Sequence, residues 1–382
     1  MMKSYIAAAS LALLGLGAAQ ADEGNSPLAP AGANFTTLVT TALAIEGLTG
    51  DALGNLYTTG RQPPAGQSCP VFRLSLSSVS PVIVGRVPAP SPIGQCSPNG
   101  IAVGSNGALF ISEADKIYTV VPNATTPALA TVYASGVPGT NGLAFDRHGN
   151  LWTGDGVTGL GRIWKITTGG VVSEALRVPP MANSVAVGRS AVTLPPNTAQ
   201  PLVANGIAFE TDGDMLVADT ARGAIWRVKF DRHGNMEANQ TSCDTTFTAN
   251  TLCWNNVWVA HPVLEGADGI ALDRAGNVWV AANERNAIAV VASHEGRAQA
   301  VFEVFRNPPA ATNLRNAGPL EFPTSPFLLG HKLCTANSDG NRRDNSPNTA
   351  GELGGAGAPK GKISCMDPPL SIPGLPLPVS AH

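Results

Sequence analysis

A short motif recurs along this chain and restricts its fold more than any other feature. Each copy begins with a polar residue, a Gly and an apolar residue, and a second Gly follows the first by seven residues, ahead of another apolar run. The copies begin at Glu46, Asn99, Asn141, Asn205 and Asp268. Repeats that keep one internal spacing are typical of an architecture built from a single supersecondary unit.

Each unit has the pattern of a small antiparallel sheet. In the fourth copy the apolar run 206–209 precedes an Asp-Gly turn, the run 215–218 returns, and a third run follows at 224–228. A more variable fourth strand is expected to complete the unit. A degenerate sixth copy begins at Ser325. The chain is therefore predicted to be all-β, a six-bladed β-propeller. The alternative, a β-sandwich with coincidental turns, does not explain the recurring motif.

The predicted ring also has a way to close. The last blade has strands near 327–330, 332–336 and 361–366, but no fourth strand follows them, because the sequence becomes Pro-rich. Residues 34–41 are strand-like and precede the first blade. We expect this N-terminal strand to complete blade six, since closure removes exposed sheet edges.

The two ends of the chain are assigned to separate segments. Residues 1–21 carry one charge, Lys3, then an apolar stretch that ends in Ala19-Gln20-Ala21, the pattern of a cleaved signal peptide. A membrane anchor is the alternative, but the apolar run is short of the roughly 20 residues that span a bilayer. The propeller is predicted over 22–366 and a Pro-rich tail over 367–382. The mature protein is expected to be secreted or periplasmic, without a membrane span.

The cysteines suit an oxidising compartment. Their number, six, is even, and none forms a CxxC pair, which argues against a zinc or redox site. Six cysteines allow 15 pairings. The pairing of sequence neighbours is expected here, and the predicted blades bring the same pairs together. These pairs are Cys69–Cys96, Cys243–Cys253 and Cys334–Cys365.

Composition narrows the class of partner. Charged residues make up 13% of the chain, against about 25% in a typical soluble domain, and the net charge is −3. No basic footprint for nucleic acid is present. The sequence contains no GxSxG, P-loop or HExxH motif. The expected partner is a small-molecule substrate, and the protein is expected to be a monomer.

The residue that opens each repeat carries the chemical signal. In a propeller the first strand of each blade lines the central channel, so the six openers should meet at its mouth. They are Glu46, Asn99, Asn141, Asn205, Asp268 and Ser325. Oxygen donors that include two carboxylates suit a hard divalent cation, Ca²⁺ first and Mg²⁺ or Mn²⁺ next. The alternative is that these residues bond only their own backbone, as Asn and Asp before Gly commonly do. That alternative is favoured for Asn99 and Ser325, and a metal site is favoured for the other four.

These residues resemble the senescence-marker-protein/gluconolactonase family of regucalcin-like propellers. The resemblance rests on Glu46-Gly47, Asn141-Gly142, the run from Asn205 to Phe209 and the run from Asp268 to Trp279. It implies a Ca²⁺-type ion held by Glu46, Asn141, Asn205 and Asp268. It also implies lactonase activity, with Asp268 acting on the attacking water as general base. In the family an Arg often precedes the blade-three Asn by two residues and contacts a sugar lactone, whereas this chain has Gly139 there.

Other residues are expected near the pocket. Asp155, Asp219 and Asn283 end second strands on the side of the openers and are predicted to support the metal ligands. Asn99 and Ser325 are predicted to contact the substrate or to support the ligands in the same way. His261 is a candidate base of the kind used by paraoxonase-like or lyase-like propellers. Long connections over 179–203, 233–266 and 338–360 are predicted to cover the pocket.

The sequence thus predicts an exported, metal-dependent hydrolase of a lactone or related ester. Two alternatives remain open, a non-catalytic NHL-like propeller that binds a ligand or partner, and an enzyme of the streptogramin-lyase type.

Overall fold

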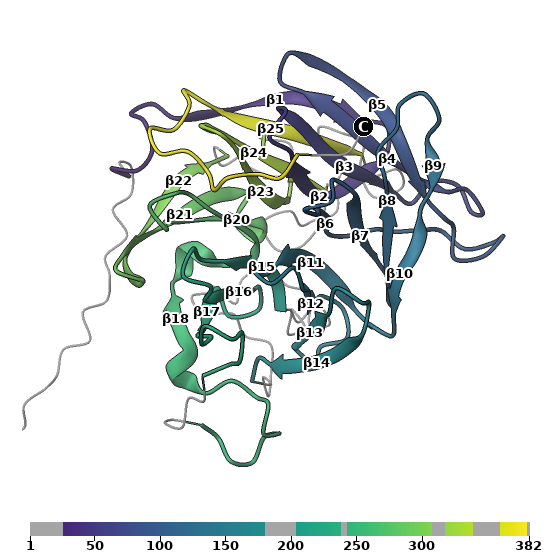
Figure 1. The fold of residues 1–382 in the computed structure, drawn as a ribbon. Coiled ribbons are helices and arrows are strands. Elements are labelled where there is room, and N and C mark those ends of the chain that lie inside the picture. The colour runs from purple at the N-terminus through teal and green to yellow at the C-terminus, as the bar shows by residue number, and fades with distance from the viewer. Residues whose placement is uncertain (1–25, 180–203, 238–242, 308–317, 339–359, 380–382) are drawn as a thin grey trace, which may run out of the picture.

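The computed structural model describes residues 26–179, 204–237, 243–307, 318–338 and 360–379. Strands in these segments form six sheets around a central axis (Figure 1). The helical elements among them are the 3₁₀ turns η1 (Trp254–Asn256), η2 (Pro262–Leu264) and η3 (Asn283–Arg285). The predicted all-β, six-bladed propeller is confirmed. No helix in the described segments is long and apolar enough to cross a bilayer. The predicted signal peptide, residues 1–21, lies outside them.

In blades one to five the main strands follow one another in chain order from the axis outward, and in blade six the N-terminal strand takes the outermost place. Blade one contains β2 (Ala44–Gly50), β3 (Asn55–Arg61), β4 (Cys69–Ser75) and β5 (Ser78–Val87), with β9 (Ala128–Leu129) added in parallel to β5. Blade two contains β6 (Ile101–Val103), β7 (Leu109–Glu113), β8 (Lys116–Val120) and β10 (Thr131–Ser135). Blade three contains β11 (Thr140–Phe145), β12 (Leu151–Asp155), β13 (Arg162–Ile166) and β14 (Val172–Arg177).

The remaining blades repeat the pattern. Blade four contains β15 (Ala204–Phe209), β16 (Met215–Asp219), β17 (Ala224–Val228) and β18 (Val257–Ala260). Blade five contains β19 (Ala267–Leu272), β20 (Val278–Ala282), β21 (Ala287–His294) and β22 (Arg297–Arg306). Blade six contains β23 (Pro323–Leu329), β24 (Lys332–Asn337), β25 (Gly361–Asp367) and, outermost, β1 (Asn34–Thr41).

Blade six closes the ring as predicted. Strand β1 pairs antiparallel with β25, from Asn34 opposite Asp367 to Thr41 opposite Gly361. All three predicted disulfides are present, joining Cys69 to Cys96, Cys243 to Cys253 and Cys334 to Cys365. The last pair links residues that face each other on β24 and β25. Disulfides of this number are compatible with an extracellular protein.

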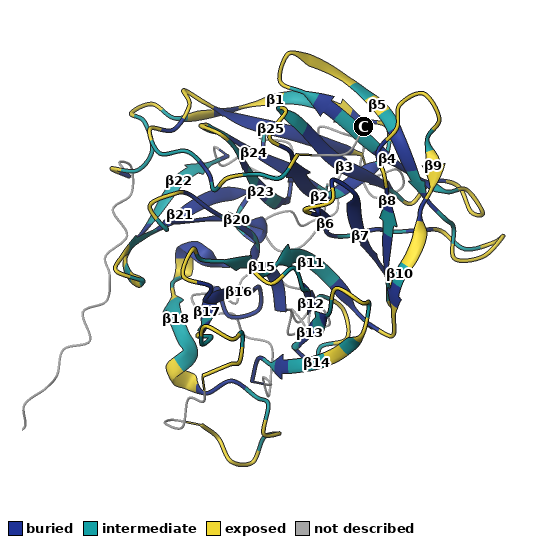
Figure 2. Ribbon diagram, in the orientation of Figure 1, coloured by how far each residue is buried: buried dark blue, intermediate teal, exposed yellow. Residues whose placement is uncertain are grey.

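The apolar core is divided among the interfaces between blades. Six separate clusters of buried side chains occur, and each draws residues from two neighbouring blades. Figure 2 shows the consequence, with inner strands buried and outer hairpins exposed. Each blade is thus stabilised mainly by its two neighbours, so the ring holds its inner strands at fixed mutual positions.

The turn between the first and second strands is built by an aspartate that the repeat analysis did not single out. Asp146 accepts hydrogen bonds from the backbone N–H groups of His148 and Asn150, and from Trp152 Nε1 at 2.9 Å. Asp273 does the same in blade five with Trp279, and Asp51 does so in blade one with the Tyr57 hydroxyl in place of a Trp. Burial raises the pKa of Asp146, but hydrogen bonds from Trp152, Asn150 and the turn backbone outweigh it and hold that pKa below its usual value.

The Pro-rich segment after β25 packs across the end of the propeller where these turns lie. Its backbone bonds to blades six, five and one in turn: Gly374 N–H donates to the Gly330 carbonyl at 2.8 Å, Pro373 accepts from Arg274 at 2.9 Å, and Pro378 accepts from Ala52 at 2.8 Å. The segment is yellow in Figure 1 and ends beside blade one. Leu375 and Leu377 line the central cavity of about 270 Å³ at this end.

Candidate functional site

The six openers lie next to one another around the axis, at the end of the ring away from the tail. Five of them lie on the first strand of a blade, and Asn99 lies two residues before β6. The strands β2, β6, β11, β15, β19 and β23 contact each other in that order, and β23 contacts β2. The Gly after each opener makes the approach close. A Cβ on Gly47 would lie 2.5 Å from the Asn99 carbonyl oxygen, and one on Gly206 would lie 2.6 Å from that of Asp268. Thr324 Oγ1 completes the circle by donating to the Glu46 carbonyl at 2.6 Å.

A β-bulge marks the opener in most blades. In blades one, three, four and five, the two residues of the opener-Gly pair on the first strand oppose a single residue of the second strand. In blade two the backbone of Ser112 bonds to both Asn99 and Gly100. Bulges re-aim side chains and are common beside active sites. The same distortion therefore sets the direction of Glu46, Asn141, Asn205 and Asp268.

Asn205 and Asp268 are the most buried of the openers, at 6% and 4% exposure. Asn205 donates from Nδ2 to Thr220 Oγ1 at 3.2 Å, an arrangement that uses the amide nitrogen and directs Oδ1 elsewhere. Asp268 accepts from Asn283 Nδ2 at 2.7 Å through Oδ2. Asn283 thus contacts the proposed ligand it was expected to support.

Asn99, Asn141 and Ser325 differ in what holds them. Asn99 donates from Nδ2 to the Thr140 carbonyl at 3.0 Å, so it ties blade two to blade three. The Asn141 side chain packs against Gly156, where a Cβ would collide with it. Its backbone N–H donates to Thr153 Oγ1 at 3.1 Å. Ser325 lies beside Gly269, with its Cα 2.9 Å from the place of a Cβ there.

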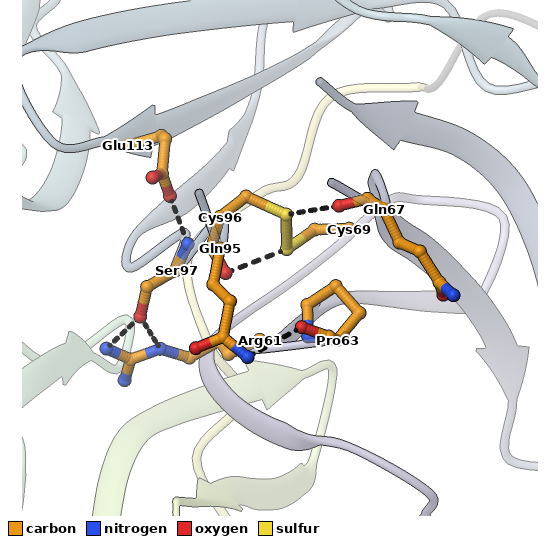
Figure 3. The surroundings of a disulfide bond; sticks show 8 residues. All are labelled: Arg61, Pro63, Gln67, Cys69, Gln95, Cys96, Ser97 and Glu113. Atoms are coloured by element: carbon orange, nitrogen blue, oxygen red, sulfur yellow. Dashed lines mark hydrogen bonds between the residues drawn. A yellow bond between two sulfur atoms is a disulfide. The ribbon is translucent and has the colours of Figure 1, made fainter. Parts of the chain in front are cut away.

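Glu46 has a partner that the sequence analysis missed. Its carboxylate forms an ion pair with Arg61 Nη1, and the two side chains are 14% and 19% exposed. Arg61 ends β3 and also donates to Ser97 Oγ, from Nε at 3.0 Å and from Nη2 at 2.9 Å (Figure 3). The only signal in the sequence was the position of a single Arg at the end of a second strand, where other blades carry Glu113, Asp155 and Asp219.

Those three carboxylates are engaged in local structure. Asp155 pairs with Arg162 at 2.9 Å and Asp219 with Arg222 at 2.7 Å. Glu113 accepts the Ser97 backbone N–H at 2.7 Å, and burial raises the pKa of Glu113 despite this bond and the Arg61 charge. Asp155 and Asp219 therefore stabilise their own blades through these ion pairs.

His261 also has a local role. Its Nδ1 accepts a hydrogen bond from the backbone N–H of Val263 at 3.2 Å and so caps η2. The backbone N–H of His261 donates to the Gly223 carbonyl at 3.1 Å. The connections over 179–203, 233–266 and 338–360 lie largely or partly outside the described segments. That they cover the pocket therefore stays a prediction.

A group of three carboxylates lies at the opposite end of blade four. Glu210, Asp212 and Asp214 occupy the turn after β15, with one oxygen of each within 4.8 Å of the others. Arg227 bonds to all three, at 2.7, 3.3 and 3.0 Å. Burial raises the pKa of Glu210 to about 6, although Arg227 opposes that rise. Because Arg227 supplies the compensating charge, this cluster reads as an internal ion-pair network.

Six sheets closed by the N-terminal strand, with polar first-strand residues meeting at one end, define this protein as a six-bladed β-propeller with a polar channel mouth. Residues 189–312 match the family model described as "SMP-30/Gluconolactonase/LRE-like region". The matched segment includes Asn205 and Asp268. The family resemblance seen in the sequence is confirmed over this part of the chain.

Solved structures agree on the fold. A luciferin-regenerating enzyme superimposes with a TM-score of 0.58 at 15% identity, covering 92% of this chain and 100% of its own. Regucalcin from Agrobacterium tumefaciens, described as a calcium-binding protein, gives 0.56 at 18% identity, covering 91% and 97%. A candidate gluconolactonase gives 0.52 at 15% identity, covering 94% and 99%. A comparison with curated protein sequences found no match. At these identities the structural likeness is one of fold.

Proposed function

We propose that this protein is an exported, metal-dependent hydrolase of a lactone or related ester. The observation that supports the proposal most is that Glu46, Asn141, Asn205 and Asp268 occupy the same bulge position in the first strands of four blades of a closed ring. The family match over residues 189–312 supports the same reading. Export is supported by the signal-peptide pattern at residues 1–21 together with the three disulfides.

The donor set suits a divalent cation. All four side chains offer oxygen, two of them as carboxylates, and Ca²⁺ prefers such ligands. Thr220 holds the Asn205 amide by its nitrogen, and Asn283 holds one oxygen of Asp268. Supporting hydrogen bonds of this kind orient the ligands of a metal site. A bound cation would polarise the ester carbonyl and stabilise the negative charge that develops on its oxygen.

The chain's own groups supply the proton transfer. Asp268 would accept a proton from water as the water oxygen attacks the carbonyl carbon, and the acyl–oxygen bond then breaks. The leaving alkoxide would take up the proton that Asp268 accepted, which gives the hydroxyl of the product and regenerates the carboxylate. Asn283 keeps Asp268 in position through the 2.7 Å hydrogen bond.

The substrate is proposed to differ from a sugar lactone. The family resemblance implies an Arg at position 139, but Gly139 has a φ of +81°, and a Cβ there would collide with Asp155 Oδ1. Asp155 is itself paired with Arg162 at 2.9 Å. The described structure therefore leaves no room for a long side chain at that position, and an aliphatic or aromatic lactone or ester fits the proposal better.

The test is a panel of lactones and esters assayed with the wild-type protein, with and without a chelator, and with Asp268→Ala. We expect chelation to abolish hydrolysis and Asp268→Ala to lower kcat/KM by about 10²–10⁴. Asp212→Ala is the matched control, because it removes a carboxylate that is 60% exposed at the far end of blade four. Equal loss in both variants would contradict the assignment of Asp268.

A non-catalytic ligand-binding propeller is the second candidate. Two observations favour it: Glu46 already has a cationic partner in Arg61, and the Asn99 side chain is bonded to the backbone of the neighbouring blade. This candidate predicts no hydrolysis of any panel member and no binding of a divalent cation.

A further inference from the structure

Arg61 places a positive charge directly beside a proposed metal ligand. The guanidinium reaches Glu46 through Nη1 and Ser97 through Nε and Nη2. Both side chains of the ion pair are mostly shielded from water, at 19% and 14% exposure. A charge pair in this setting is screened far less than one on the open surface.

Arg61 is also held in place by Ser97, which does not belong to the proposed metal site. Ser97, which accepts two of its hydrogen bonds, is fixed by its own backbone N–H, which donates to Glu113 at 2.7 Å. The residue before Ser97 is Cys96, whose disulfide to Cys69 anchors this connection to β4 (Figure 3). The guanidinium is therefore fixed at the channel mouth by two hydrogen bonds that do not involve Glu46.

We propose that Arg61 is a resident counter-cation of the ring, which neutralises Glu46 in the metal-free protein and lowers the affinity of the ring for a divalent cation. The inference rests on the proposed function, because it takes Glu46 as a metal ligand. Arg61 would lower the affinity of the ring for the metal, whereas the four proposed ligands would bind it.

Charge arithmetic gives the direction of the effect. Glu46 and Asp268 bring −2 to the mouth, and Arg61 reduces this to −1 while no metal is bound. When a divalent cation binds Glu46, the Ser97 bonds keep the guanidinium nearby, so like charges face each other at short range. Removing Arg61 abolishes that repulsion. It also frees the Glu46 carboxylate from a cation that competes with the metal ion for it.

A different role would have the opposite sign. If Arg61 served mainly to orient Glu46 for the metal, as supporting residues often do, its removal would weaken binding. The sign of the change in metal affinity therefore separates a competing charge from an orienting one.

The experiment is a calorimetric titration of Ca²⁺ into chelator-stripped protein. For Arg61→Gln we expect binding about tenfold tighter than for the wild type, equivalent to about 1.4 kcal/mol. Arg61→Lys keeps the charge and should stay within about twofold of the wild type. Arg73→Gln is the matched control, since Arg73 lies on β4 of the same blade and forms no ion pair within the described residues. It should also leave the affinity unchanged.

A second variant protects the test against misfolding. Ser97→Ala removes the anchor and lets Arg61 move away from the metal, so we expect about threefold tighter binding. Thermal unfolding gives an independent readout. Without metal, the Tm of Arg61→Gln should be lower than that of the wild type. Saturating Ca²⁺ should raise the Tm of Arg61→Gln by more than it raises the Tm of the wild type.

Two results would overturn the inference, and they are distinguishable. If the wild type binds Ca²⁺ and Asp268→Ala does not, but Arg61→Gln binds equally or more weakly, the proposed site stands and the role of Arg61 is wrong. If the wild type binds no divalent cation, the proposed function fails and this inference fails with it.

Discussion

At the scale of single residues, the two glycines of the repeat are required for different reasons. The second, as in Gly54 and Gly276, has a positive φ of +87° and +82°, which side-chain-bearing residues rarely adopt. The first has ordinary backbone angles but lies against the next blade. The nearest atoms to a Cβ on Gly206 would be the Asp268 carbonyl oxygen at 2.6 Å and Gly269 Cα at 2.7 Å. Both belong to backbone that cannot turn away.

Gly206→Ala should therefore destabilise the whole ring. Separating blades four and five by the needed distance disturbs the packing of their shared core, and we expect a loss of about 2–4 kcal/mol in the free energy of unfolding. Urea unfolding followed by tryptophan fluorescence measures it. The same variant should weaken metal binding, because Asn205 and Asp268 flank the contact.

The matched control is Gly169→Ala. A Cβ there would have Thr167 Oγ1 as its nearest neighbour, at 3.8 Å, which is an ordinary contact. Its unfolding free energy should stay within about 0.5 kcal/mol of the wild type. If Gly206→Ala were equally mild, close contact between blades would not explain why the repeat keeps its first Gly.

The openers could be predicted from the sequence, but their partners could not. Glu46 and Asp268 stand out because they occupy one fixed position of a repeat. Arg61, Ser97 and Glu113 do not, since each acts through a contact between different strands or blades. Ser97 reaches Arg61 across 36 positions of sequence, in a connection that no repeat aligns.

At the scale of strands, the closure of blade six carries the largest consequence for stability. Strands β1 and β25 join the two ends of the propeller, and Cys334–Cys365 covalently links β24 to β25 across 31 positions of sequence. Replacing both cysteines by Ala should lower the free energy of unfolding by about 4 kcal/mol, from the unfolded-chain entropy that the link removes. Urea unfolding of the oxidised protein measures this loss.

The control is the double Ala variant of Cys243 and Cys253. This pair spans only 10 positions, so the same argument gives about 3 kcal/mol. Cys334 and Cys365 are both buried in the interface between blades six and one, whereas only Cys253 of the control pair is buried, so the loss of packing should be larger for the first variant. A larger loss for the Cys243–Cys253 variant would contradict the view that blade six contributes most to the stability of the ring.

Inner strands were predictable because they are apolar and repeat, whereas among the outer strands only some were. The closing strand over 34–41 was found, with the same limits in the structure. In contrast, β9 and β10 expose most of their residues and lack an apolar pattern. The parallel addition of β9 to β5 of the preceding blade is a tertiary contact without a local signal.

At the scale of the whole molecule, the two ends of the channel differ. Polar openers surround one end, and the segment after β25 crosses the other, where Leu375 and Leu377 help to enclose the apolar cavity of about 270 Å³. Leu370, at 3% exposure, packs into the interface between blades five and six. Nothing in the sequence beyond its Pro content indicated that this segment would bind back to three blades.

A chain that ends at Pro369 should be less stable and more open at this end. It loses the burial of Leu370, which alone is worth about 1.5–3 kcal/mol, together with the backbone bonds to Gly330, Arg274 and Ala52. We expect a lower Tm and increased binding of a hydrophobic dye to the uncovered cavity. A chain that ends at Val379 keeps every contact named here and should match the wild type. Because the polar mouth lies at the other end, Ca²⁺ affinity should change little, and its complete loss would show that the tail supports the openers through the shared inner strands.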